Sequence, residues 1–380
     1  MAFERFRDAP LTRSLLGRVR ESARTAADRL GRRPVIMEVC GTHTVALSRY
    51  GLRAALADLV ELKSGPGCPV CVTDYRDLDT IILMARVPGV TIATFGDLVR
   101  VPGSFSTLEK ERARGAEVLV FYSPADAVAW AGEHPDREVV FVGVGFETTT
   151  PAVAAALEEA DQQGITNFSL YSAHKLIPPV MRALVVGARN RLDAFLLPGH
   201  VSTVIGRAAF DFLTREFALP AAVTGFEPLD LVLGLKAVLE QLAQGRAEVT
   251  NCYPRVVKEQ GNPRAREVMD RFFLPTEATW RGIGPVPDSG LALRPEFAHR
   301  DAGRRFPVEV PEPRIPAGCR CGELLQGNLQ PPECPLFGRR CTPEHPVGPC
   351  MVSSEGACAA YYLYEGNAHQ ADEAATFDPC

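Results

Sequence analysis

Short apolar runs alternate with longer stretches of helical spacing between residues 35 and 248. The runs hold four to six residues and are mostly rich in β-branched side chains, which is typical of buried strands in a parallel sheet. The predicted strands are 35–39, 90–94, 118–122, 139–144, 167–171, 194–197 and 221–224. The predicted helices are 74–85, 125–131, 151–163, 178–188, 203–217 and 228–244. This alternation predicts an α/β fold in which helices cover parallel sheets.

The pattern changes at both ends of this region. Residues 1–33 carry nine Arg against four acidic residues, with apolar positions at helical spacing, so we expect an amphipathic helix that packs on the body. Residues 275–316 are rich in Pro, Gly and Arg and predict irregular connecting structure. After the N-terminal helix we therefore expect two Rossmann-like domains, 34–114 and 115–248, and a Cys-rich, mostly helical or irregular domain, 249–380.

Net charge and cysteine content indicate the compartment of the protein and the kind of partner it binds. The chain has 380 residues, a net charge of −5 and 11 Cys, of which seven fall in the last 62 residues. The acidic balance argues against nucleic acid as a partner. No apolar run approaches the roughly 20 residues that span a bilayer, and no secretory signal is recognisable. We expect a cytoplasmic protein whose clustered thiols bind metal or exchange electrons.

Cys40 and His43 follow the first predicted strand directly, within the sequence Cys-Gly-Thr-His-Thr. The carboxyl ends of parallel strands border the crevice in which α/β proteins bind ligands. A thiolate and an imidazole at this spacing can share one metal ion, or the imidazole can keep the thiol deprotonated. The alternative is a buried cysteine beside a solvated histidine.

Cys68 and Cys71 form a CxxC motif between Gly and Pro residues. This spacing suits a disulfide or half of a metal site, and Thr73 can cap a following helix. No second CxxC lies at zinc-ribbon spacing, so we favour a redox dithiol. Asp97, on the loop after another strand, is a ligand, a proton acceptor or an orienter of His43, or else a helix cap.

Three further strand ends carry Glu147, His174 and His200. Each residue alone is usually structural, but together they predict a lined cleft at one rim. The Gly-Val-Gly that precedes Glu147 lacks both a third Gly and a phosphate-binding Lys, so we expect no nucleotide site.

The tail holds six widely spaced cysteines on Pro- and Gly-rich segments. They are Cys319, Cys321, Cys334, Cys341, Cys350 and Cys358. Zinc knuckles favour paired spacings that are absent here, whereas single cysteines on loops can surround a cubane cluster. Four ligands are required, which leaves two thiols for a dithiol beside the cluster. Cys252 and Cys380 have no assigned task.

Six motifs, in this order, resemble the HypD family of [NiFe]-hydrogenase maturation proteins from about residue 35 to the C-terminus. They are CGTHT at 40–44, GPGCPVC at 65–71, TFGDLVRVPGS at 94–104, GFETT at 145–149, PGHVS at 198–202 and MVSSEGACAAYY at 351–362. Glu355, in the last motif, joins Cys40, His43, Cys68, Cys71 and Asp97 as a candidate catalytic residue.

The resemblance implies two α/β domains and a [4Fe-4S] domain. It implies an assembly factor rather than a conventional enzyme. With the small chaperone HypC, the protein would build the Fe(CN)2CO group that is destined for the hydrogenase large subunit, and it would receive cyanide from HypE/HypF.

The resemblance also implies roles for single cysteines. The family spacing assigns Cys319, Cys334, Cys341 and Cys358 as cluster ligands. Cys321 and Cys350 would then form a second dithiol between the cluster and the CxxC motif. Cys40 would bind the iron under construction, with His43 nearby.

Two other classes remain open. One is a cytoplasmic thiol–disulfide oxidoreductase resembling ferredoxin:thioredoxin reductase, in which a cluster feeds the CxxC motif. The other is a scaffold whose tail binds zinc. The Cys40/His43 pair favours maturation over the oxidoreductase, because simple disulfide reduction needs no such pair on another strand end. Metal analysis separates the zinc scaffold, since zinc-bound protein would be colourless.

Overall fold

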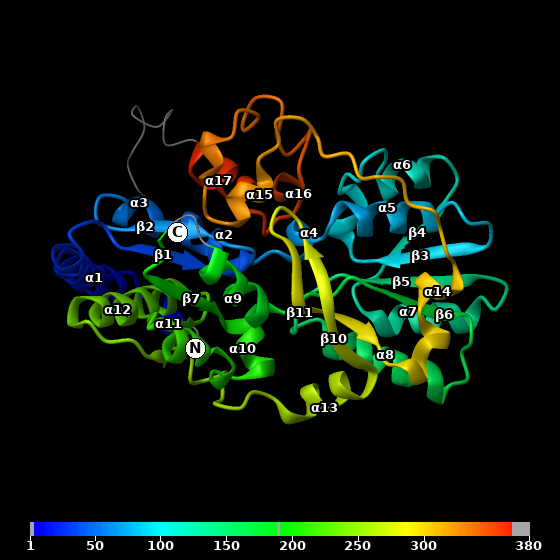
Figure 1. The fold of residues 1–380 in the computed structure, drawn as a ribbon, viewed down its shortest axis with the longest axis horizontal. Coiled ribbons are helices and arrows are strands. Elements are labelled where there is room, and N and C mark those ends of the chain that lie inside the picture. The colour runs from blue at the N-terminus through cyan, green and yellow to red at the C-terminus, as the bar shows by residue number, and fades with distance from the viewer. Residues whose placement is uncertain (1–3, 188–190, 367–380) are drawn as a thin grey trace.

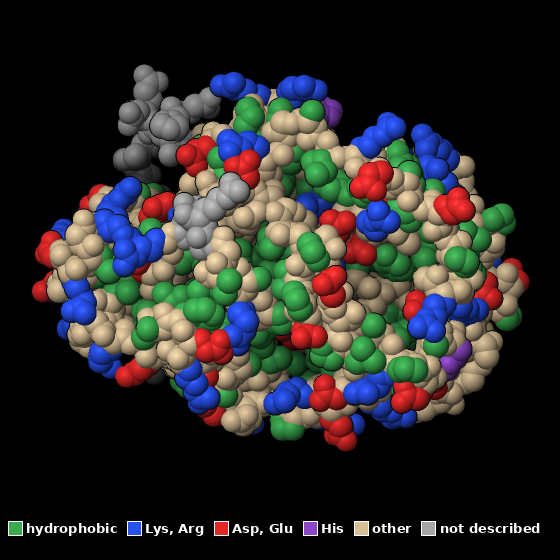
Figure 2. Space-filling view, viewed as in Figure 1, with side chains coloured by type: hydrophobic (Ala, Val, Ile, Leu, Met, Phe, Trp, Pro, Cys, Tyr) green, Lys and Arg blue, Asp and Glu red, His purple; other side chains and the backbone are tan. Residues whose placement is uncertain are grey.

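The computed structural model describes residues 4–187 and 191–366. Two parallel sheets with helices packed against them form most of the molecule, and a third, Cys-rich part lies against one of them (Figure 1). The predicted α/β class is therefore confirmed. Figure 2 shows acidic and basic side chains interspersed on one face, with hydrophobic side chains between them.

The first sheet has the strand order β2-β1-β7-β8-β9, and all its neighbouring strands are parallel. Its strands are β1 (Val35–Glu38), β2 (Glu61–Ser64), β7 (Ala194–Pro198), β8 (Ala221–Thr224) and β9 (Val249–Asn251). The second sheet has the order β4-β3-β5-β6 and is also parallel throughout. Its strands are β3 (Val90–Thr94), β4 (Glu117–Val120), β5 (Glu138–Gly143) and β6 (Phe168–Ser172).

The sheets do not divide at residue 114, where we placed a domain boundary. Strand β3 pairs with β4 and β5, while β7 returns to pair with β1. The physical reason is that an apolar run specifies a buried strand but not its neighbour, since any such strand can pair with any other. The chain thus leaves the first sheet after β2, builds the second sheet, and comes back.

Helices connect and cover these strands. The α-helices are α1 (Ala9–Leu30), α2 (Gly41–Arg49), α3 (Leu52–Leu56), α4 (Pro69–Val72), α5 (Tyr75–Met84), α6 (Leu108–Ala113), α7 (Pro124–Glu133), α8 (Thr150–Gln162), α9 (Ile177–Gly187), α10 (Gly199–Ile205), α11 (Phe212–Phe217), α12 (Pro228–Gln244), α13 (Pro263–Phe272), α14 (Ala302–Arg305), α15 (Cys321–Leu325), α16 (Pro349–Val352) and α17 (Ala357–Tyr364). The 3-10 helices are η1 (Glu4–Arg7), η2 (Gly96–Arg100), η3 (Ala208–Phe210), η4 (Pro295–Arg300) and η5 (Pro331–Glu333). In the described ranges, no helix is long and apolar enough to cross a membrane.

The N-terminal helix is present as α1, which packs along α12 (Figure 1). Its buried residues Val19, Ala23 and Ala26 follow the expected helical spacing. The helix predicted at 203–217 is interrupted. Gly206 has a φ of 86°, and a Cβ there would lie 2.4 Å from the carbonyl oxygen of Glu259, so the chain turns at this glycine.

The segment predicted to be irregular contains an antiparallel hairpin of β10 (Phe273–Trp280) and β11 (Gly284–Leu293). Prolines within both strands hide this hairpin from sequence patterns, because Pro cannot donate a ladder hydrogen bond. Trp280 at its tip is fully buried and donates to the Ser289 hydroxyl at 2.8 Å. The hairpin stands between the two parallel sheets (Figure 1).

The Cys-rich tail returns to the carboxyl end of the first sheet. Helix α17 packs against α2, and α16 packs against α4, which are the helices that follow β1 and β2. Figure 1 shows this part, coloured orange to red, above α2 and α4. The cysteine motifs from the two ends of the chain are therefore neighbours in space.

Candidate functional site

Cys40 lies between the end of β1 and the first residue of α2. Its side chain is buried, with 7% exposed. This burial, and then the nearby Glu355 carboxylate, raise the pKa of the thiol to about 12, although backbone N–H groups of His43 and Thr42 oppose the rise. The thiol is therefore protonated at neutral pH.

His43 is fully buried, but it does not serve Cys40. Its Nε2 lies 3.1 Å from the carbonyl oxygen of Gly225 and donates to it. Its Nδ1 then carries a lone pair, and this atom has no hydrogen-bond partner among the described residues. Burial lowers the His43 pKa to about 4. The imidazole thus makes no hydrogen bond to the Cys40 thiol within the described residues, and burial favours the neutral form of both groups.

The loop that carries Cys40 and the loop that leads to Cys68 cross in close contact. Gly41 donates its backbone N–H to the Gly67 carbonyl oxygen at 2.9 Å, and a Cβ on Gly67 would lie 2.2 Å from the Cys40 nitrogen. Cys68 and Cys71 follow at the start of α4 and form a disulfide, with their Cα atoms 5.2 Å apart. The crossing therefore sets the CxxC motif beside Cys40.

The helix after the CxxC motif is not capped by Thr73. Asp74 is its N-cap and accepts from the Arg76 backbone N–H at 2.9 Å. The Thr73 hydroxyl instead donates to the Pro69 carbonyl oxygen at 2.9 Å. Asp is as good an N-cap as Thr, so sequence alone did not decide between neighbours.

The segment between α16 and α17 brings Glu355 to the same place. Its Oε1 accepts from the Thr42 hydroxyl at 2.6 Å, and burial raises its pKa. Asp97, which follows β3, accepts from the Ser353 hydroxyl at 3.1 Å. Asp97 thus contacts the tail, and its bond to Ser353 does not support a role in orienting His43.

Five tail cysteines line one small cavity. They are Cys319, Cys321, Cys334, Cys341 and Cys358. The sulfurs of Cys319 and Cys321 lie 3.3 Å apart. Cys321 also forms a hydrogen bond with the Cys358 thiol. The backbone N–H of Val347 donates to the Cys341 sulfur at 3.3 Å. The four cysteines that the family spacing selects therefore converge, and Cys321 joins them.

Comparison with known proteins identifies the family of the chain. A family model described as "HypD: Hydrogenase formation hypA family" matches residues 12–365. The chain belongs to the HypD family. Its resemblance to that family, found in the motifs, is thereby confirmed.

Several relatives are similar over most of their length. "Hydrogenase maturation factor HypD" of Azotobacter vinelandii is 44% identical over 369 residues, which cover 95% of this chain and 96% of the relative. The protein of the same name from Rhodobacter capsulatus is 44% identical, with 95% and 97% covered. That of Escherichia coli is 45% identical, with 87% and 88% covered. These relatives of the HypD-family chain are hydrogenase maturation factors.

Cys350 does not line the five-cysteine cavity of this HypD-family chain. It is fully buried in α16, the helix that packs on α4, and the Cys71 sulfur lies 3.9 Å from the carbonyl oxygen of the neighbouring Pro349. Cys350 is thus on the CxxC side of the tail. Its pairing with Cys321 stays a prediction. Cys252 is half-buried against α12, and Cys380 lies outside the described residues.

Cysteine is the only residue type in the cavity lining with a side chain that commonly binds metals. Within residues 4–187 and 191–366, no three His, Cys, Asp or Glu side chains are placed to bind one metal ion. A [4Fe-4S] cubane requires a different arrangement, with one cysteine ligand for each of its four irons. Apart from Arg320, the non-cysteine walls are apolar or glycine, including Leu324, Leu336 and Phe337. The residues present therefore fit a cubane held by thiolates.

Two charged residues near the site escaped the sequence predictions. Glu38 is 1% exposed and its carboxylate accepts from the Cys40 backbone N–H at 3.1 Å and from the Thr44 hydroxyl. A lone acid in an apolar strand just before Cys40 was a signal that could have revealed it. Arg281, at the hairpin tip, had no such signal, because its segment looked irregular.

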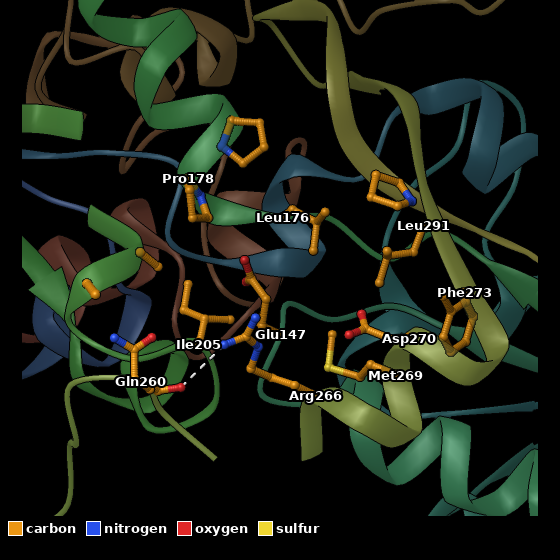
Figure 3. A pocket seen from close by; sticks show the side chains of 14 residues that line it. Glu147, Leu176, Pro178, Ile205, Gln260, Arg266, Met269, Asp270, Phe273 and Leu291 are labelled. Carbon is orange, nitrogen blue, oxygen red and sulfur yellow. Dashed lines mark hydrogen bonds between the residues drawn. The ribbon is translucent and has the colours of Figure 1, made fainter. Parts of the chain in front are cut away.

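The predicted rim of Glu147, His174 and His200 does not form. Glu147 and His174 follow strands of the second sheet, whereas His200 follows β7 of the first sheet and stacks on Phe226, with 3.9 Å between ring centroids. Glu147 instead lines a mostly apolar cavity of about 470 Å³ (Figure 3). The strand ends were identified correctly, but sequence did not reveal that they belong to different sheets.

Glu147 and His174 are both buried and only partly paired. One carboxylate oxygen of Glu147 accepts from the Ile177 backbone N–H at 3.0 Å, and burial raises its pKa to about 7. His174 contacts the Ser172 hydroxyl at 3.1 Å, and burial lowers its pKa to about 3. At neutral pH the histidine is therefore uncharged, and burial favours the protonated form of the Glu147 carboxyl group.

Proposed function

We propose that this HypD-family protein is a hydrogenase maturation factor that assembles the Fe(CN)2CO group of [NiFe]-hydrogenase with a HypC-like small chaperone. The observation that carries the proposal is the convergence of Cys40, the Cys68–Cys71 pair and the Cys-rich tail at one end of the first sheet. A separate thiol, a redox pair and a thiol-lined cavity together exceed what disulfide reduction requires.

Cys40 binds the iron that is being built up, as its substrate. Thiolate is a soft ligand that suits iron carrying cyanide and carbonyl. The Cys40 thiol is protonated when free, so iron binding must release its proton. Its burial keeps water from the bound iron, and Glu355, which contacts Thr42 beside it, is placed to receive the proton.

The Cys68–Cys71 pair supplies electrons in units of two. Releasing cyanide from a thiocyanate, R–S–CN, takes two electrons and one proton and gives R–SH and CN⁻. Oxidation of the Cys68/Cys71 dithiol to the disulfide provides those two electrons and releases two protons, so the exchange is balanced. In this proposal the thiocyanate is carried by a HypE/HypF-like donor.

Cys319, Cys334, Cys341 and Cys358 would hold the [4Fe-4S] cluster, with Cys321 in contact with Cys319 and Cys358. When bound there, such a cluster would supply single electrons, and the Cys68–Cys71 disulfide takes up two of them with two protons to return to the dithiol. Cys350, buried in α16 against α4, would form with Cys321 the second dithiol that passes these electrons on. The hydrogenase large subunit receives the finished group.

Infrared spectroscopy tests the proposal. The protein is co-produced with its small chaperone, purified without oxygen and measured in the region of cyanide and carbonyl stretching vibrations. We expect bands of both ligands, and we expect them to be lost in Cys40→Ala. A complex with a full iron–sulfur complement but without either band would instead favour the thiol–disulfide oxidoreductase, and a colourless zinc-bound protein would favour a scaffold.

A further inference from the structure

The cavity that Glu147 lines is separate from the cysteine site. Its volume of about 470 Å³ lies within the range of small-molecule sites, and its walls are mostly apolar. The walls come from the start of α9, from the end of α10 with η3, and from α13 with the β10–β11 hairpin (Figure 3). None of the cysteines in the described ranges lines it. A ligand bound there would therefore not touch the thiols of the proposed maturation site.

Glu147 is the buried charged group of these walls. The residue is 2% exposed, and its Oε1 accepts from the Ile177 backbone N–H at 3.0 Å. The other oxygen, Oε2, has no hydrogen-bond partner among the described residues. Pro178 and Pro179 are the next residues of α9, and proline has no N–H. The first turn of the helix therefore offers the carboxylate no second donor.

No cationic side chain in the described part of the chain forms an ion pair with Glu147. Only two backbone N–H groups stabilise its charge, its own and that of Ile177, and burial raises its pKa to about 7. Arg266 lines the same cavity, but it is exposed, and its Nη1 donates to the Gln260 carbonyl oxygen at 3.4 Å. Asp270 is also exposed and carries the opposite charge to Arg266. The buried carboxylate thus lacks the paired charge that such a group needs.

The chemistry of the walls indicates what kind of cation fits. A magnesium or calcium ion takes six or more oxygen ligands, whereas the walls near Glu147 include Leu176, Ile205 and Met269. A primary ammonium group needs fewer partners, because it brings a positive charge and donates N–H groups to a carboxylate. A hydrocarbon body attached to it is removed from water against the apolar walls. The cavity therefore suits an organic amine better than a metal ion.

We propose that this cavity binds a small primary amine, whose ammonium group donates to Oε2 of Glu147 and whose hydrocarbon part packs against Ile205, Met269 and Phe273. The inference does not depend on the proposed function, and binding forms and breaks no covalent bond. Helix α9 leads from β6 of the second sheet to β7 of the first, and its first turn is one wall of the cavity. A bound amine would therefore hold this connection against α13 and the hairpin.

Isothermal titration calorimetry of the full chain tests the site with three probes of equal length. They are hexylamine, 1-hexanol and hexanoate, measured at about pH 8, where an alkylammonium group stays protonated. We expect hexylamine to bind roughly tenfold or more tightly than 1-hexanol, because only the amine supplies the charge that Glu147 lacks. Hexanoate should bind more weakly than 1-hexanol, since the carboxylate repels it. Equal affinities for hexylamine and 1-hexanol, or no binding of hexylamine, would overturn the inference.

Two variants locate the binding site. Glu147→Gln keeps the shape of the side chain and removes its charge, so it should weaken hexylamine binding roughly tenfold and leave 1-hexanol binding within about twofold of wild type. Asp270→Asn is the matched control, because it removes a carboxylate that lines the same cavity but is screened by water and salt. It should bind hexylamine as wild type does.

A wild-type affinity of Glu147→Gln for hexylamine would contradict the proposed site. A tenfold loss in Asp270→Asn would do the same, because the amine would then lie at the exposed carboxylate. If Glu147→Gln does not fold, the three probes on the wild-type protein decide, since that comparison needs no variant.

Discussion

Gly67 leaves no space for a side chain where the two cysteine loops cross. In Gly67→Ala the new Cβ would lie 2.2 Å from the Cys40 nitrogen and 2.4 Å from its Cα. Both are backbone atoms and cannot turn away, so the loops must separate by about 1 Å to reach ordinary contact distance. The hydrogen bond from Gly41 to the Gly67 carbonyl oxygen, now 2.9 Å long, would be lost.

The structure gives a magnitude for this change. A lost hydrogen bond costs about 1 kcal/mol, and overpacking typically costs about 1–3 kcal/mol. We expect Gly67→Ala to lower the free energy of unfolding by about 2–4 kcal/mol. Because the separation also moves Cys68 away from Cys40, we expect hydrogenase maturation to fail even at temperatures where the variant is folded.

Urea unfolding followed by circular dichroism, together with the infrared bands of the complex, measures both effects. Gly17→Ala is the matched control, since a Cβ there meets nothing within 4 Å in the middle of α1. It should stabilise the helix by up to about 1 kcal/mol. If Gly67→Ala unfolded at the wild-type urea concentration and yielded wild-type bands, the close crossing of the loops would be wrong.

Four further predictions concern single side chains. Cys334→Ser should lose the visible absorbance of anaerobically purified protein, and unchanged iron and sulfide would contradict its role as ligand. Cys40→Ala should keep that absorbance but yield no active hydrogenase. Cys68→Ser should mature hydrogenase more slowly than wild type, and an equal rate would argue against the redox role of the pair. Burial raises the pKa of Glu147 from 4.5 to about 7. Stability should therefore be full below pH 4.5 and fall by up to about 3 kcal/mol as the pH rises through 7, a loss that unfolding curves of Glu147→Gln should not show.

Buried strands were predictable where their side chains were mostly apolar, with Thr as the only polar residue type. The runs 90–94 and 221–224 coincide with β3 and β8 at both ends. Strand β2 was missed because its sequence, Glu-Leu-Lys-Ser, looks polar. Lys63 is nevertheless buried there, because its amine donates to the Gly327 carbonyl oxygen at 2.6 Å. A hydrogen-bond partner so distant in the chain cannot be recognised from the local sequence pattern.

The candidate site was predictable in its members but not in its contacts. The meeting of the tail with the CxxC motif was implied by the resemblance to the HypD family, because no local pattern places the two segments together. That His43 would bond Gly225, and Asp97 would bond Ser353, depends on loops far apart in the chain. The burial of Arg281 beside the CxxC motif could not be predicted at all, since it depends on the packing of the hairpin tip.

The return of the chain to the first sheet has a consequence for biosynthesis. Ile36 pairs with Ala194. One edge of β1 therefore stays unpaired until the ribosome has synthesised all strands of the second sheet and then β7. At about 5–20 residues per second this delay lasts on the order of ten seconds. The second sheet, which is contiguous in the chain, can form meanwhile, whereas β1 and β2 expose an unpaired edge. We expect nascent chains stalled before β7 to be the species that most needs a chaperone.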